Sequence, residues 1–155
     1  MNKDEFYMRE ALKQAKKAFD SDEVPVGAVI VHKETIIGRG HNQIKMLKDP
    51  TAHAEMIAIT QAAAELKNER LIDCSMYVTI EPCSMCAGAL VLARIKHLIY
   101  AVDDPKTGAC GSIVNLIDHK KLNHRIKVRK GILGQESGSL IGEFFKRKRR
   151  SRIVA

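Results

Sequence analysis

Two cysteines, Cys83 and Cys86, lie three positions apart in the segment TIEPCSMC, residues 79–86. Side chains at this spacing lie on the same side of a helical turn, so both sulfur atoms can bind one metal ion. Pro82 and the helix-forming residues that follow place the pair in a first helical turn, where the helix dipole favours thiolate. The pair alone is compatible with a redox dithiol, a structural zinc site or a catalytic metal centre.

A histidine and a glutamate about thirty residues earlier, in the segment His53-Ala54-Glu55, favour the catalytic centre. A structural zinc site uses four protein ligands, and the chain has neither a second C-x-x-C nor a suitably spaced histidine pair. We therefore predict that zinc is bound by three residues, with its fourth position left to water. These ligands are His53, Cys83 and Cys86.

Glu55 is predicted to take a proton from that water and to deliver protons to the substrate. Residues two apart in a regular helix face away from each other, so His53 must lie at or before the first turn. Asp49-Pro50 and a predicted helix cap at Thr51 are consistent with this. Together, H-x-E and a later P-C-x-x-C form the signature of zinc-dependent nucleobase deaminases.

The elements that must position these residues follow from the apolar periodicity of the chain. Apolar side chains at three- and four-residue steps over residues 5–19 predict an amphipathic helix. Residues 25–32 and 35–42 are predicted as strands of an antiparallel hairpin with a turn at Lys33-Glu34. The other predicted strands are 74–80, 97–102 and 125–133, and the other predicted helices are 54–66, 84–95 and 138–150.

This alternation of strands and helices predicts a single α/β domain over residues 1–155. The expected architecture is a three-layer α/β/α sandwich around a mixed five-stranded sheet. Two helices that start from the same edge of its parallel part would bring His53 close to the cysteines.

Composition restricts the class of protein and its setting. A chain of 155 residues with 45% hydrophobic residues is consistent with one globular domain. The N-terminal residues are charged throughout and no apolar run approaches the ~20 residues of a membrane span, so neither a signal peptide nor a membrane segment is expected. Four cysteines without a dense framework of pairs favour a reducing, cytoplasmic setting.

The net charge of +8 comes entirely from residues 101–155, because positive and negative side chains balance over residues 1–100. The chain ends in a basic helix and tail, about residues 137–155, that contains KRKRRSR. A basic face of this kind predicts a polyanionic partner such as RNA. The alternative is a solvated surface that only promotes solubility.

Motifs along nearly the whole chain resemble the cytidine-deaminase-like superfamily and, within it, the bacterial-type tRNA-specific adenosine deaminases. They include VPVGAVIV, GRGHN, TAHAEMIAI, TIEPCSMCAGAL, DPKTGACGS, NHRIKV and FFKRKRR. The resemblance implies a cytidine-deaminase-like fold and deamination of the wobble adenosine, position 34, in a tRNA anticodon loop to inosine with release of ammonia. It also implies one Zn²⁺ per subunit, a homodimer, no nucleotide cofactor and no membrane association.

The same resemblance implies contacts to the substrate. Asn42 would hydrogen-bond the adenine edge, Val26 would pack on its ring and Ala54 would offer backbone groups. Contacts to neighbouring nucleotides are implied for Asp104, Lys106, Asn123, Phe144, Phe145 and Arg149. Asn42 and Asp104 are also ordinary turn residues. Because adjacent helix residues cannot share a face, one of the two phenylalanines is expected in the core.

Three rival functions remain. A superfamily deaminase acting on free guanine, cytosine or cytidine would share the zinc ligands and Glu55 but would not need the basic last third. A non-catalytic zinc or RNA-binding module would have no use for Glu55. A redox protein would need neither His53 nor Glu55.

Overall fold

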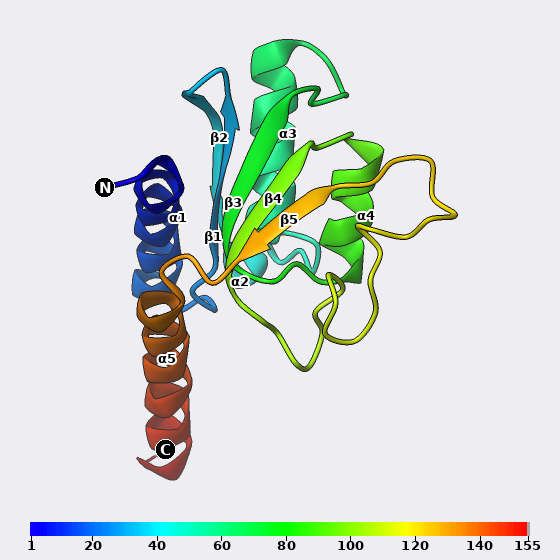
Figure 1. Cartoon of the computed structure of the whole chain (residues 1–155). Coiled ribbons are helices and arrows are strands. Elements are labelled where there is room, and N and C mark those ends of the chain that lie inside the picture. The colour runs from blue at the N-terminus through cyan, green and yellow to red at the C-terminus, as the bar shows by residue number, and fades with distance from the viewer. Residues whose placement is uncertain (155) are drawn as a thin grey trace.

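Five strands form one mixed sheet in the computed structural model, which describes residues 1–154 (Figure 1). The sheet order is β2-β1-β3-β4-β5, with β1 antiparallel to both of its neighbours and β3, β4 and β5 parallel. The strands are β1 Gly27–His32, β2 Thr35–His41, β3 Cys74–Ile80, β4 His97–Val102 and β5 Lys127–Lys130. The predicted mixed five-stranded sheet is therefore confirmed.

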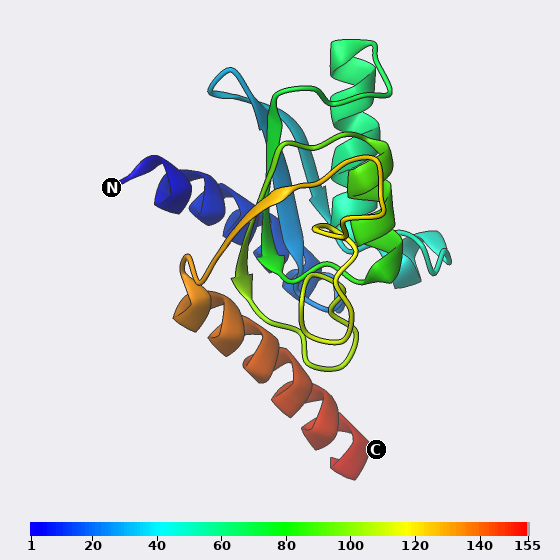
Figure 2. The same cartoon turned by 45° about the vertical axis from the view of Figure 1, so that its right-hand side comes forward.

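Helices cover both faces of this sheet (Figures 1 and 2). One face carries α1 Lys3–Asp20 and α5 Gly134–Val154, and the other carries α3 Ala54–Leu66 and α4 Ser84–Leu92. A single short turn of helix, α2 Ile44–Leu47, links β2 to the loop before α3. The C-terminal part of α5 extends beyond the sheet, as Figure 1 shows. The three-layer architecture is also as predicted.

The alternation of side chains along β1 divides the core between the two faces. Ala28 and Ile30 pack in the cluster that includes α3 and α4, whereas Val29 and Val31 pack in the cluster that includes α1. Successive strand residues point to opposite faces, so a strand that is apolar at every position can serve both layers.

Two glycines allow helices to approach the sheet backbone closely. A Cβ atom on Gly27 would lie 2.0 Å from the carbonyl oxygen of Ala11 in α1, and one on Gly40 would lie 2.2 Å from that of Ala54 in α3. The first turn of α3 is therefore held directly against the end of β2. This contact places the predicted zinc-binding histidine at the carboxyl edge of the sheet.

Several predicted boundaries were wrong. Thr51 does not cap α3, because its N–H and hydroxyl both donate to Asp49 Oδ1, and His53 occupies the N-cap position instead. The helix predicted to reach residue 95 ends at Leu92, because Arg94 adopts the left-handed conformation that commonly follows a helix end. The short helix α2 was not predicted.

The C-terminal boundaries also differ from the prediction. Pairing between β4 and β5 ends at Tyr100 and Lys130, so β5 is shorter than the predicted residues 125–133. Helix α5 begins at Gly134, four residues earlier than predicted, and its Ser137 hydroxyl donates to the buried carbonyl of Thr79. Ala155, the end of the predicted basic tail, lies outside the described residues. No helix within residues 1–154 is long and apolar enough to cross a membrane.

Candidate active site and metal centre

The predicted metal ligands lie at the first residues of two helices on the same face of the sheet. His53 is the N-cap of α3, and Cys83 is the N-cap of α4, which follows the end of β3. Both residues have extended backbone conformations, with φ of −75° in each case. Cys86 lies in the first turn of α4 and is fully buried. The three side chains therefore meet at the carboxyl edge of the parallel strands.

The distances between these side chains fit a zinc ion. His53 Nδ1 lies 3.7 Å from Cys83 Sγ and 3.6 Å from Cys86 Sγ. All three candidate ligand atoms lie within 4.8 Å of one another. Tetrahedral zinc with the usual Zn–S and Zn–N bond lengths separates a sulfur from a nitrogen ligand by about 3.6 Å. The observed distances from nitrogen to sulfur therefore match those of a tetrahedral zinc site.

The electrostatics of the thiols also favour metal binding. Hydrogen bonds with Cys86 and, to a smaller extent, with His53 lower the pKa of the Cys83 thiol to about 4, although burial raises it. The hydrogen bond between the two thiols, together with burial, raises the pKa of Cys86. The pair therefore holds one thiolate at neutral pH, and thiolate is the form that binds metal.

Glu55 lies beside the three ligands in the first turn of α3 and is only 3% exposed. Burial raises the pKa of its carboxyl to about 7, while the charge of His53 lowers it and that of Cys83 raises it. The side chain also interacts with the Cys86 thiol. Because His53 precedes the helix, the i, i+2 spacing does not force the two side chains apart. A buried carboxyl with a pKa near neutrality can both accept and donate a proton.

Asn42 lies at the end of β2 and connects that strand to the start of α3. Its side-chain Oδ1 accepts a 2.8 Å hydrogen bond from the Ala54 N–H, and its own N–H donates to the carbonyl of Val26 at 3.2 Å. The oxygen is therefore occupied, and within residues 1–154 the NH₂ group remains the available donor. The Ala54 N–H is not free for a base, and Val26 is almost entirely buried.

Three of the other predicted contact residues line one cleft. Asp104, Lys106 and Phe145 border a hollow of about 450 Å³ at the ends of β3 and β4. Phe145 is 43% exposed, whereas Phe144 is buried and faces Phe19 of α1 with a ring separation of 6.1 Å. The prediction that one of the two phenylalanines belongs to the core is confirmed, and it is Phe144.

The carboxylate of Asp104 shapes the loop that carries Lys106. Its Oδ1 accepts from the N–H groups of Lys106 and Thr107 at 3.0 and 3.2 Å, and its Oδ2 accepts from the Thr107 hydroxyl at 2.8 Å. The turn interpretation of Asp104 is therefore correct. A carboxylate has about four acceptor sites, so this role leaves capacity for a donor from RNA.

Two predicted contact residues lie away from the metal cluster. Asn123 accepts a 3.0 Å hydrogen bond from Arg94, which follows the C-terminal end of α4, whereas Cys83 precedes its N-terminal end. Arg149 is exposed on α5, four residues after Phe145, and so lies on the same side of that helix. Their roles stay predictions.

Comparisons with known proteins identify the family. The family model described as MafB19-like deaminase matches residues 1–149. A protein of Aquifex aeolicus named tRNA-specific adenosine deaminase is 47% identical over 96% of this chain and 98% of its own length. The chain belongs to the tRNA-specific adenosine deaminase family.

One solved structure agrees with this family assignment, and another similar structure is a deaminase with a different substrate. One from a study of A-to-I editing by tRNA:A34 deaminases at the wobble position of transfer RNA superposes on this deaminase with a TM-score of 0.84. It is 41% identical and covers 87% of this chain and 98% of its own. A guanine deaminase from Bacillus subtilis is 40% identical over 66% of each chain, with a TM-score of 0.62.

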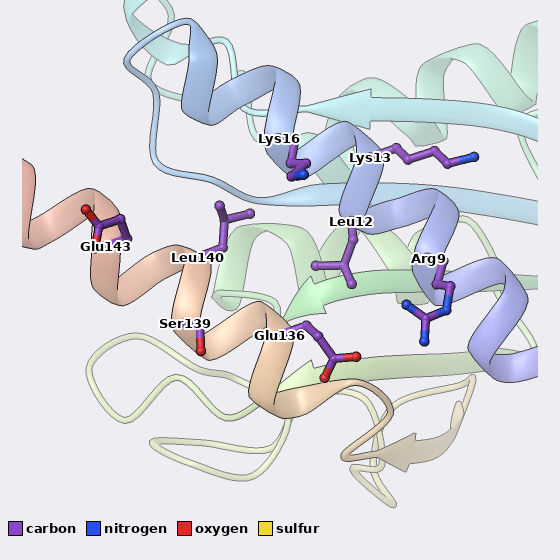
Figure 3. A pocket seen from close by; sticks show the side chains of 8 residues that line it. All are labelled: Arg9, Leu12, Lys13, Lys16, Glu136, Ser139, Leu140 and Glu143. Carbon is purple, nitrogen blue, oxygen red and sulfur yellow. The ribbon is translucent and has the colours of Figure 1, made fainter.

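Another hollow of the deaminase has no part in this site. It measures about 600 Å³ and lies between α1 and α5, as Figure 3 shows. Leu12 and Leu140 face it, with lysine and arginine side chains on α1 and glutamates on α5 at its borders. None of the predicted site residues lines it.

Sequence reasoning did not single out Glu81, which lies two residues before the predicted metal ligand Cys83 and is 2% exposed. The available signal was a charged residue directly after an apolar strand and directly before a proline. Such a residue is buried only if its charge is satisfied, which the sequence alone does not reveal.

Proposed function

We propose that this deaminase converts the wobble adenosine, position 34, of a tRNA anticodon loop to inosine and releases ammonia. The observation that carries the proposal is the convergence of His53, Cys83 and Cys86 with the buried carboxyl of Glu55 at one edge of the sheet. The names of the Aquifex aeolicus relative and of the solved structure at 41% identity support the same reaction.

His53, Cys83 and Cys86 are the residues that would hold one zinc ion per subunit. Zinc bound there acts as a Lewis acid that makes water a nucleophile near neutral pH. Glu55 then has two tasks. Its carboxylate accepts one proton from the attacking water and passes it to adenine N1. It then accepts the second proton of that water from the hydroxyl formed at C6 and passes it to the departing amine. Water supplies the oxygen of inosine, and the amine leaves as ammonia.

Asn42 is placed to orient the base. Since its oxygen is held by the Ala54 N–H, its NH₂ group is the part that can donate to an acceptor nitrogen of adenine. The buried oxygen contact fixes the direction of that donor. Val26, which is 5% exposed, would pack on the adenine ring, whereas Ala54 has no exposed surface and its N–H is held by Asn42.

The cleft that contains Asp104, Lys106 and Phe145 would receive nucleotides next to the adenosine. A wobble base must be turned out of its stack to reach the metal, at a cost of a few kcal/mol. The exposed ring of Phe145 offers a stacking surface, and Lys106 and Arg149 offer positive charge to phosphates. The basic end of α5 would extend this surface.

We also expect a homodimer that acts in the cytoplasm. A hollow of about 490 Å³ along α2 and α3, with exposed Leu47 at its border, supports an interface on this side. Asn123 lies at the other end of α4 from Cys83, so its predicted contact would be with nucleotides away from the reacting adenosine. Light scattering tests the dimer, which should have about twice the chain mass of 17.3 kDa.

Substrate comparison tests the reaction. The deaminase is incubated with a tRNA bearing adenosine at the wobble position and, separately, with free adenosine, cytidine and guanine. Sequencing should then detect inosine, which is read as guanosine, at the wobble position. Deamination of only the small molecules would refute the proposal and favour the guanine deaminase alternative, which the structural similarity at 40% identity makes the strongest rival.

Glu55→Ala tests the mechanism separately. We expect turnover to be lost while the zinc content stays near one ion per chain, because Glu55 is not among the three ligands. Retained activity in this variant would remove Glu55 from its proposed role in proton transfer.

A further inference from the structure

Glu81 is a buried carboxylate that takes part neither in the proposed metal site nor in the proposed proton transfer. It follows β3 and is 2% exposed. Within residues 1–154 it forms no ion pair with a lysine, arginine or histidine. A buried charge without a cation is costly unless hydrogen bonds satisfy it.

Within residues 1–154, all hydrogen-bond partners of its carboxylate come from one loop, residues 104–112. Oε1 accepts from the Asp104 N–H at 3.0 Å and from the Ser112 hydroxyl. Oε2 accepts from the N–H groups of Cys110 at 2.9 Å and Ser112 at 3.1 Å. The carboxylate therefore ties together the beginning and the end of the loop that carries Lys106.

The same loop is also attached to the backbone next to the metal ligand. Ala109 N–H donates to the Pro82 carbonyl at 2.9 Å, and Gly108 pairs with Cys83 in an isolated β-bridge. A Cβ atom on Gly108 would lie 2.4 Å from the Glu81 carboxyl carbon, so only glycine leaves room for the carboxylate. Glu81 thus holds the loop at the residues that lead directly into Cys83.

The donors around the Glu81 side chain require that both of its terminal atoms accept hydrogen bonds. Three backbone N–H groups point at the side chain, and a backbone N–H cannot reverse its role. An ionised carboxylate accepts at both oxygens, whereas glutamine presents an NH₂ group at one of them.

We infer that Glu81 is a positioning residue for RNA binding. As an anionic acceptor it fixes the 104–112 loop relative to Cys83, and so holds Asp104 and Lys106 where the nucleotides beside the reacting adenosine must lie. This inference rests on the proposed function of the cleft. Glu81 would thus fix how far the surface that binds the flanking nucleotides lies from the metal centre.

Glu81→Gln is the main test, because it preserves size and removes one acceptor. We expect amide hydrogen exchange in residues 104–112 to accelerate, since at least one N–H would face an NH₂ group. We expect KM for tRNA to rise at least about tenfold, with a smaller change in kcat and zinc still near one per chain. If Glu81 served only to stabilise the fold, Glu81→Gln would lower Tm without raising KM more than it changes kcat.

Two further variants sharpen the test. Ser112→Ala removes only the hydroxyl contact and keeps three N–H bonds, so its effect on exchange and KM should be in the same direction but smaller. It also carries the test if Glu81→Gln fails to fold. Glu69→Gln makes the same charge change at an exposed position between α3 and β3 and should behave like the wild type.

The outcomes separate this inference from the proposed function. Unchanged loop exchange and unchanged KM in Glu81→Gln would overturn the inference, and so would a loss of activity that follows loss of zinc. A wild-type protein that does not deaminate tRNA would refute the proposed function instead. Loop exchange would still report whether Glu81 fixes the 104–112 loop.

Discussion

Asn42 allows helix stability and base recognition to be separated with two substitutions at one position. Its oxygen accepts the N–H of Ala54, a residue with no exposed surface, and its NH₂ group remains for the substrate. Asn42→Ala removes both functions. Asn42→Asp keeps an acceptor for the Ala54 N–H and removes only the donor.

The structure determines the size of each effect. In Asn42→Ala the buried Ala54 N–H loses its partner, which should lower the free energy of unfolding by about 1–3 kcal/mol. For a chain of this length that corresponds to a Tm lower by roughly 2–12 °C. In Asn42→Asp the acceptor remains at the N-terminal end of α3, where a negative charge is favourable. Burial of the new charge at a residue that is 5% exposed offsets part of this gain, so Tm should fall less than in Asn42→Ala.

Both variants should lower kcat/KM for the same reason. An acceptor nitrogen of the bound adenine would lose its donor, at a cost of about 1–3 kcal/mol, or roughly 5- to 150-fold. Asn42→Asp should be at least as impaired as Asn42→Ala, because a carboxylate repels the acceptor. The assays are thermal unfolding and deamination of an anticodon stem-loop.

A matched control is available at Asn68, whose side chain also accepts a backbone N–H, that of Arg70 at 2.9 Å, on an exposed loop. Asn68→Asp should leave kcat/KM at the wild-type value. If Asn42→Asp lost as much thermal stability as Asn42→Ala, the contact with Ala54 would not be the stabilising one. If Asn42→Asp kept full kcat/KM, the NH₂ group would not be the donor to the base.

Three other predictions concern the tail, the metal and acid stability. Deletion of residues 146–155 should weaken tRNA binding and reduce its salt dependence. In a salt titration, the slope of log K against log salt concentration should fall by about 0.7–0.9 for each phosphate that the shortened chain no longer neutralises. An unchanged slope would show that the tail serves solubility only. Removal of zinc with a chelator should lower the free energy of unfolding by about 4 kcal/mol if the free ion had been present at a thousand times its Kd, measured as a fall in Tm that added zinc reverses. The hydrogen bond from Arg129 lowers the pKa of Asp4 in the folded protein. This bond therefore stabilises the fold above the unfolded pKa of about 3.9, and the stabilisation is lost as the pH falls through the lower pKa of the folded state. In acid titrations followed by circular dichroism, Asp4→Asn should therefore be less stable than the wild type near neutral pH and lose less stability below pH ~4.

The clustering of the candidate metal ligands could be predicted from the sequence because it depends on residue types at short spacings. Cys83 and Cys86 belong to one helical turn, and Glu55 follows His53 by two positions. The strands could be predicted for a similar reason, since apolar runs such as residues 97–102 are buried on both faces. These features depend on local sequence and on one rule about sheet edges.

Features that depend on tertiary contacts could not be predicted. Thr51 is of a residue type that often caps helices, but both of its donors bind Asp49. Asn42, which directly follows β2, accepts from the first residue of α3 instead. Glu81 appears in the sequence as one more charged residue, and its role depends on a loop that lies more than twenty residues away. In both cases a distant segment provides the partner that decides the role.

The separation in sequence between the two parts of the proposed metal site also has a consequence for stability. His53 and Cys86 are 33 residues apart, and strand β3 lies between them. An ion that stays bound to both residues closes a loop of chain, as a disulfide does, and so limits the conformational entropy that the chain can gain when it opens. Unlike a disulfide, this cross-link forms between reduced thiols and a histidine. One ion would then serve both in catalysis and as a reversible cross-link between the first turns of α3 and α4.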